Sequence, residues 1–146
     1  MIRTMTESDL LHVVELSREL GYPAPIEELR ARFVMLTMDA GTGLFVAERA
    51  GAVIGFIQVG TRVPLESPVH CEIIALSITG RAQRTGAGRA LVARAVTFTK
   101  ERGITALRVR SNVMRDVSHV FYTQLGFEKK KTQHVYELPV IRTAES

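Results

Sequence analysis

The chain has 146 residues, which is enough for one domain with a hydrophobic core and too few for two domains of ordinary size. Its formal net charge is +4, and no apolar run approaches the ~18 residues that a membrane span requires. The N-terminus also lacks the plan of a signal peptide, so we expect a single cytoplasmic domain over residues 1–146 that does not enter a membrane. The single cysteine, Cys71, and histidines without paired ligand spacing predict neither an internal disulfide nor a metal site.

Two helices are predicted at the start of the chain. Thr6, followed three residues later by Asp9, has the spacing of a capping box, and the apolar pattern after it predicts a helix from about Glu7 to Leu20. Residues 21–25 form a Gly-Pro break. Beyond the break, apolar residues recur at helical spacing and predict a second helix: Ile26, Leu29, Phe33 and Leu36.

The hydrophobic pattern then changes to that of strands. Residues 44–47 and 53–59 are short segments rich in branched side chains and predict an antiparallel hairpin. Residues 61–70 contain two prolines and predict a loop. Residues 71–78 are apolar on both faces apart from Glu72 and Ser77, which indicates a strand covered on both sides and central in the sheet.

The second half of the chain mixes helices and strands. A helical stripe predicts a helix from Gly88 to about Arg102, a strand follows around residues 107–109, and residues 118–124 predict a short helix. The tail at 127–138 is expected to supply one or two more strands. Its basic run, Lys129 to Lys131, is typical of a solvated turn or a guarded sheet edge, so we expect no nucleic-acid partner.

The run from Gln83 to Gly88 lies between the predicted central strand and the long helix that follows. Glycines at such a junction let successive backbone N–H groups surround an anion at the positive end of a helix. Arg84 lies within the run and Arg81 and Arg89 lie beside it, and these arginines could neutralise phosphates or remain solvated surface residues. The run therefore predicts a site for a phosphate-bearing ligand.

Two common phosphate loops do not fit this run. A nucleoside-triphosphate loop ends in Gly-Lys-Ser or Gly-Lys-Thr, whereas this run continues Gly88-Arg89-Ala90. A dinucleotide fingerprint needs a small residue at the position of Leu91 and would open the fold, whereas the run begins past mid-chain. A third pattern, Q/R-x-x-G-x-G/A, matches Gln83 to Gly88 at every specified position.

Two later features accompany the third pattern. Residues 121–127 read Phe-Tyr-Thr-Gln-Leu-Gly-Phe, similar to an F-Y-x-x-x-G-F signature, and Asn112 follows the predicted strand at 107–109. Together with the glycine run, these features resemble the GNAT superfamily of acyl-CoA-dependent N-acetyltransferases. The motifs cover the second half of the chain, and the first half resembles the family only in element order.

The resemblance implies an α/β (α+β) fold with a mixed, mostly antiparallel central sheet, splayed central strands and flanking helices. It also implies acetyl-CoA as co-substrate, with the glycine loop around the pyrophosphate and a polar residue near the pantetheine arm. The backbone N–H near Ile78 would stabilise the oxyanion. The residues that the resemblance assigns to coenzyme A are Ile78, Gln83, Arg84, Thr85, Gly86, Ala87, Gly88, Arg89 and Asn112.

Two side chains are candidates for proton transfer. Tyr122 matches the tyrosine that acts as general acid in many enzymes of this superfamily. Glu72 lies eleven positions before Gln83 (83 − 72 = 11), the offset of the catalytic glutamate in the histone-acetylating branch. An acid in an otherwise apolar strand is expected to hold its proton more tightly, which suits a base near neutral pH. The alternatives are deprotonation through ordered water or a structural ion pair of Glu72.

The expected reaction is direct transfer of an acetyl group to a primary amine, with a small-molecule amine as the preferred acceptor. Glu66 and Glu72 could attract a cationic amine. The alternatives are a protein or peptide N-acetyltransferase and a non-catalytic acyl-CoA-binding sensor. The resemblance also allows a homodimer, because dimers through terminal strands are common in proteins of this kind.

Overall fold

The computed structural model describes residues 1–19, 21, 23–110 and 116–141. The chain divides into two compact units, Met1–Arg110 and Ser111–Ser146. Among these described residues, the first unit contains the sheet, three α-helices and the glycine loop, and the second contains one α-helix and an extended tail. Among the described residues, no helix is long and apolar enough to cross a membrane.

The sheet of the first unit has five strands in the order β1-β2-β3-β4-β5. The first three pairings are antiparallel and the pairing of β4 with β5 is parallel. This mixed, mostly antiparallel sheet confirms the expected fold class. The strands are β1 (Ile2–Thr4), β2 (Thr42–Arg49), β3 (Ala52–Arg62), β4 (His70–Ile78) and β5 (Leu107–Val109).

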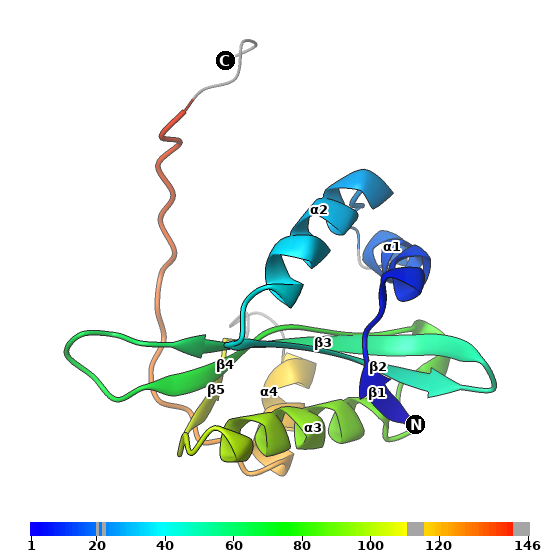
Figure 1. Ribbon diagram of the computed structural model, residues 1–146. Coiled ribbons are helices and arrows are strands. Elements are labelled where there is room, and N and C mark those ends of the chain that lie inside the picture. The colour runs from blue at the N-terminus through cyan, green and yellow to red at the C-terminus, as the bar shows by residue number, and fades with distance from the viewer. Residues whose placement is uncertain (20, 22, 111–115, 142–146) are drawn as a thin grey trace. The chain divides into compact units, whose positions relative to one another are not determined.

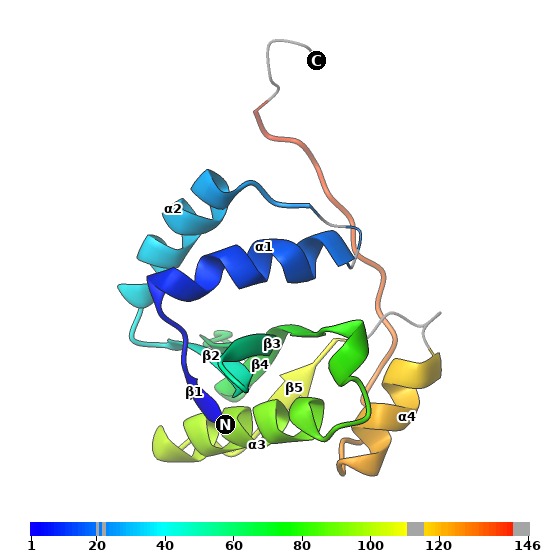
Figure 2. The ribbon, with the colours of Figure 1, turned by 90° about the vertical axis from the view of Figure 1, so that its right-hand side faces the viewer.

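Helices cover both faces of this sheet, as Figures 1 and 2 show. On one face lie α1 and α2, and their apolar sides pack on side chains of β2 and β3 such as Val46 and Phe56. On the other face lies α3, whose Leu91 and Ala95 are fully buried and whose Phe98 ring meets Phe45 edge to face at 6.2 Å. The α-helices of the first unit are α1 (Leu10–Glu19), α2 (Ile26–Thr37) and α3 (Ala87–Glu101).

Strand β4 pairs unequally with its two neighbours. Its pairing with β3 runs from Arg62 opposite His70 to Gly55 opposite Ile78 and contains a bulge at Ile74. Its pairing with β5 covers only residues 71–73. Beyond Ile73, no strand in the described part of the chain pairs with the β5 side of β4. The two strands therefore separate beyond Ile73, which is the splay of central strands that the resemblance implied.

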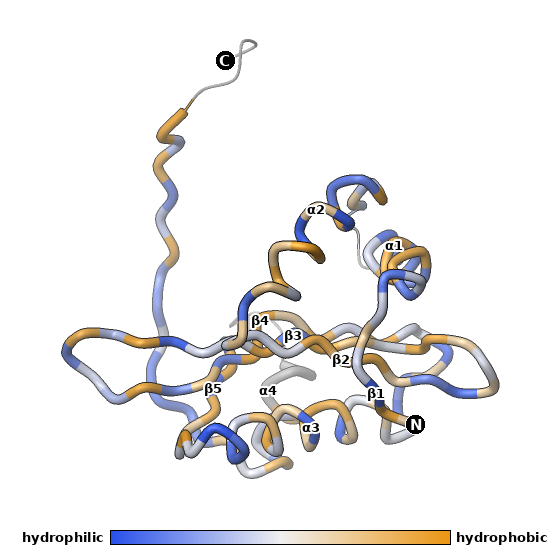
Figure 3. Tube along the Cα trace, in the orientation of Figure 1, coloured by the Kyte–Doolittle hydropathy of each residue, from blue (hydrophilic) through white to orange (hydrophobic). Residues whose placement is uncertain are grey.

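The ends of the chain differ from the sequence prediction. Strand β1 was not predicted, because its three residues are too few to show an alternating pattern. The predicted short helix is present as α4 (Asp116–Gln124), in the second unit. The strands expected at 127–138 were wrong: residues 127–140 form no regular element. Apolar residues do recur along this tail (Figure 3), but a strand forms only where its backbone groups find partners.

A buried ion pair fixes the entry to α1. Asp9, only 4% exposed, accepts hydrogen bonds from Arg3 Nη1 and Nη2, both at 2.8 Å. Its carboxylate also accepts the backbone N–H of Thr6 at 2.7 Å, which is one half of the predicted capping box. Arg3 reaches Glu48 on β2 as well, at 2.9 Å. Asp9 therefore ties the start of the helical layer to the edge of the sheet.

The hydrogen bonds from Arg3 and Thr6 lower the pKa of Asp9 to about 2. A carboxyl whose pKa is lower in the folded state stabilises the fold above its unfolded pKa, and that contribution is lost as the pH falls through the folded pKa. We expect Asp9→Asn to lower the free energy of unfolding by about 2 kcal/mol at pH 7. The difference from wild type should shrink between about pH 4 and pH 2.

Urea unfolding at several pH values measures this difference. Glu15→Gln is the matched control, because it removes an exposed ion pair with Arg18 one turn further along α1. A difference between wild type and Asp9→Asn that stays constant down to pH 2 would contradict the role of the ionised carboxylate.

Candidate active site

The predicted glycine loop joins β4 to α3. A 3₁₀ turn at Gly80–Ala82 is followed by Gln83 in extended conformation. The chain then turns through positive φ twice, at Arg84 (66°) and at Gly86 (91°). Gly86 is the N-cap of α3, and a Cβ there would meet no other atom within 4 Å. Glycine is therefore required by backbone conformation, and the space beside it is open.

The first N–H groups of α3 face the loop without helical partners. The hydrogen bond from Ala90 to the carbonyl of Gly86 is the first one within the helix. The N–H groups of Ala87, Gly88 and Arg89 precede it and are left to bind elsewhere. The helix is fifteen residues long, so its N-terminal end carries a partial positive charge. These donors fit a phosphate group.

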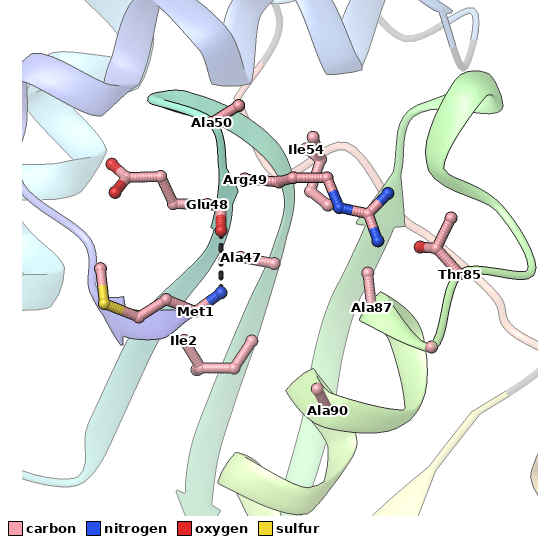
Figure 4. A pocket seen from close by; sticks show the side chains of 11 residues that line it. Met1, Ile2, Ala47, Glu48, Arg49, Ala50, Ile54, Thr85, Ala87 and Ala90 are labelled. Carbon is pink, nitrogen blue, oxygen red and sulfur yellow. Dashed lines mark hydrogen bonds between the residues drawn. The ribbon is translucent and has the colours of Figure 1, made fainter.

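A pocket of about 510 Å³ lies beside the loop (Figure 4). One wall is the loop and the first turn of α3, including Thr85, Gly86 and Ala87, and the opposite wall is β1 and the hairpin between β2 and β3. The side chain of Arg49 extends from that hairpin toward Thr85. Arg49 adds a cation that the sequence interpretation missed, because only the hairpin brings it near the loop.

Because β5 pairs with β4 only up to Ile73, later N–H groups of β4 have no strand partner on that side in the described part of the chain. Thr79 donates its N–H to Ile54 of β3 at 2.9 Å. Because N–H groups alternate in direction along a strand, those of Leu76 and Ile78 point away from β3, toward the side on which β5 no longer pairs. The N–H of Ile78, which the resemblance implied as a donor to the oxyanion, thus points to the open side of β4. The N–H of Leu76 points to the same side.

Glu72 lies between two arginines near the start of β4. Its carboxylate is 3.3 Å from Arg62 Nη2 and 3.2 Å from Arg110 Nε. The side chain of Glu72 is 9% exposed, whereas those of Arg62 and Arg110 are 51% and 71% exposed. The surroundings of Glu72 are therefore charged, unlike the apolar strand environment that the sequence indicated. Neither arginine was predicted, because both contacts depend on strand register.

Tyr122 lies on α4, in the second unit. Its ring packs edge to face on Phe121 at 5.1 Å and on Phe127 at 5.5 Å. Gly126 ends the helix with a φ of 95°, and Phe127 donates its N–H to the carbonyl of Tyr122. The three aromatic residues of the sequence signature thus form one cluster. Burial raises the pKa of the Tyr122 hydroxyl, which stays protonated at neutral pH.

The remaining predicted residues are distributed as follows. Gln83, Arg84 and Arg89 are exposed in the loop and at the start of α3. Asn112 lies outside the described residues. In the described part of the chain, no group of three or more His, Cys, Asp and Glu side chains could hold a metal ion.

Comparison with known proteins identifies the family. The model of the acetyltransferase (GNAT) family matches residues 10–127. The chain therefore belongs to the GNAT acetyltransferase family, as the sequence motifs indicated.

Among curated proteins, the chain is 31% identical to mycothiol acetyltransferase of Thermomonospora curvata over 114 residues, which are 78% of this chain and 37% of that protein. It is 24% identical to N-acetyltransferase 8 of Rattus norvegicus over 92 residues, which are 62% of this chain and 41% of that protein. The chain thus spans about two fifths of the length of these relatives.

Solved structures share the fold over most of the chain. A transcriptional regulator from Bacillus halodurans is 26% identical with a TM-score of 0.81, and the match covers 94% of this chain and 99% of that chain. The aminoglycoside N-acetyltransferase AAC(6')-Iy, solved with the bisubstrate analogue CoA-S-monomethyl-acetylneamine, has a TM-score of 0.85 at 19% identity, and the match covers 94% of this chain and 97% of that chain. At that identity the second likeness supports the fold alone.

The loop geometry gives a direct test of ligand binding. Gly88 is half-buried in the first turn of α3, among the open N–H groups, and a branched side chain there would occupy space beside them. We expect Gly88→Val to weaken the binding of coenzyme A at least about tenfold, measured by calorimetry. Ala93→Val is the matched control, because it adds the same side chain to an exposed position of the same helix. Equal affinity in both variants would contradict the loop assignment.

Proposed function

We propose that this protein transfers the acetyl group of acetyl-CoA to the primary amine of a small molecule. The observation that carries the proposal is the junction of β4 and α3. There the open N–H groups of Ala87, Gly88 and Arg89 lie at the end of a strand whose own donors face away from β3. Phosphate and thioester groups of one extended ligand could therefore bind along one path.

The chemistry is a direct displacement. The amine nitrogen bonds to the thioester carbonyl carbon, the carbon–sulfur bond breaks, and the products are an acetamide and coenzyme A. The amine loses a proton, and the departing thiolate gains one. A lysine-like amine has a pKa of about 10.4, so a base must remove its proton before attack.

Glu72 is the proposed base, acting directly or through ordered water. Each carboxylate oxygen has two acceptor sites, so contact with Arg62 and Arg110 leaves capacity for a hydrogen bond from an amine. Glu72 and Ile78 are six residues apart, roughly 20 Å along a strand. The donor to the developing oxyanion is therefore better assigned to Leu76, which opens to the same side and lies closer to Glu72. In this assignment the N–H of Ile78 lies nearer to the phosphate groups of the cofactor.

An assay of thiol release from acetyl-CoA tests the proposed acetyl transfer itself. We expect thiol release from acetyl-CoA with at least one acceptor in a panel of polyamines, aminoglycosides, amino acids and peptides. Release with peptides alone would favour a protein acceptor. Coenzyme A binding without release for any amine would favour a non-catalytic sensor and contradict the enzyme proposal.

Tyr122 is the proposed general acid, because a phenol that stays protonated can donate to the departing thiolate. We expect Tyr122→Phe to lower kcat about a hundredfold or more while the affinity for acetyl-CoA is retained. Tyr136→Phe, a change in the exposed tail, is the matched control. An unchanged kcat in Tyr122→Phe would remove this residue from the mechanism.

A further inference from the structure

The face of the sheet around Glu72 carries an excess of positive charge. Arg62 and Arg110 contact opposite oxygens of Glu72. Arg108 is the register partner of Glu72 across β4 and β5, and paired residues of neighbouring strands point to the same face. Arg62, Arg108 and Arg110 are all exposed, whereas the side chain of Glu72 is 9% exposed. Among Glu72, its two ion-pair partners and its register partner, three side chains are positive and one is negative.

The arginines keep most of their binding capacity. A guanidinium group has five N–H donors, and Arg62 and Arg110 each direct one nitrogen to Glu72. The other donors of these two groups make no hydrogen bond to another residue in the described part of the chain. Both side chains are more than half exposed. A molecule that reaches Glu72 therefore meets two guanidinium groups with free donors.

We propose that the acceptor carries a carboxylate next to its amine, as an amino acid does. This rests on the proposed function, which brings the acceptor amine to Glu72. The amine would bind Glu72, and the carboxylate would bind the free N–H groups of Arg62 and Arg110 through charge-assisted hydrogen bonds. Both arginines contact Glu72 directly, so the two groups of the acceptor must be only a few bonds apart.

The same charges act against polycations. An aminoglycoside or polyamine brings several ammonium groups to a face whose net charge is positive, and each unmatched ammonium is repelled. The substrate class of this protein therefore differs from that named for its aminoglycoside-acetylating structural neighbours, although the fold is shared.

Matched acceptor pairs test the inference. The pairs are alanine with alaninamide and β-alanine with β-alaninamide, compared by kcat/KM for acetylation. The amide has the less basic amine, so more of it is unprotonated, and a preference for the acid must come from the site. We expect wild type to prefer the acid at least about tenfold. The dipeptide glycylglycine, whose amine and carboxylate are further apart, should react more slowly than β-alanine.

Variants assign the preference to the two arginines. Arg62→Gln and Arg110→Gln should each reduce the ratio of acid to amide, and Arg62→Lys should retain more of it than Arg62→Gln. Arg30→Gln is the matched control, because Arg30 is also 51% exposed and pairs with Glu7, away from β4. Equal rates for acid and amide in wild type, or a ratio unchanged in both arginine variants, would overturn the inference.

A binding measurement separates this inference from the enzyme proposal. The guanidinium NMR signals of Arg62 and Arg110 are followed during titration with N-acetyl-β-alanine. We expect both signals to shift, and Arg62→Gln should weaken the binding of this probe. Shifts without any acetyl transfer would contradict the enzyme proposal and leave the carboxylate site standing. The absence of shifts would overturn the carboxylate site even in an active enzyme.

Discussion

The unequal pairing of β4 is the constraint on which the proposed site depends. The strand is paired with β3 along its length and with β5 only over residues 71–73. A backbone donor that is already paired in a sheet cannot bind a ligand, so a fully paired β4 would offer nothing at Leu76 or Ile78. The bulge at Ile74 belongs to the same arrangement, because it sets which N–H groups face away from β3.

The loop after β4 adds a second set of unpaired backbone donors, at the start of α3, and these suit an anion. Positive φ at Arg84 and Gly86 turns the chain so that α3 begins with its free N–H groups beside open space. Burial of Leu91 and Ala95 against the sheet holds the helix in place, so the donors are positioned by the core. Preorganised donors of this kind bind phosphate without the entropy cost of ordering a flexible loop.

The charges near Glu72 serve both the fold and the proposed chemistry. A buried carboxylate is costly unless it is paired, and Arg62 and Arg110 supply the pairing from two neighbouring segments. Both arginines remain exposed, so under the proposal the same two side chains that pair with Glu72 also select the acceptor. In the proposed reaction, donor binding and acceptor selection therefore depend on opposite ends of β4.

The sequence alone determined the family, the fold class and the position of the loop, because glycine spacing, helical periodicity and strand patterns are local properties. It missed β1 and wrongly expected strands at 127–138, since strand formation depends on a partner elsewhere in the chain. Tertiary structure alone decided the partners of Glu72 and the direction of the donors on β4. Both depend on register, and one bulged residue changes which groups face which neighbour.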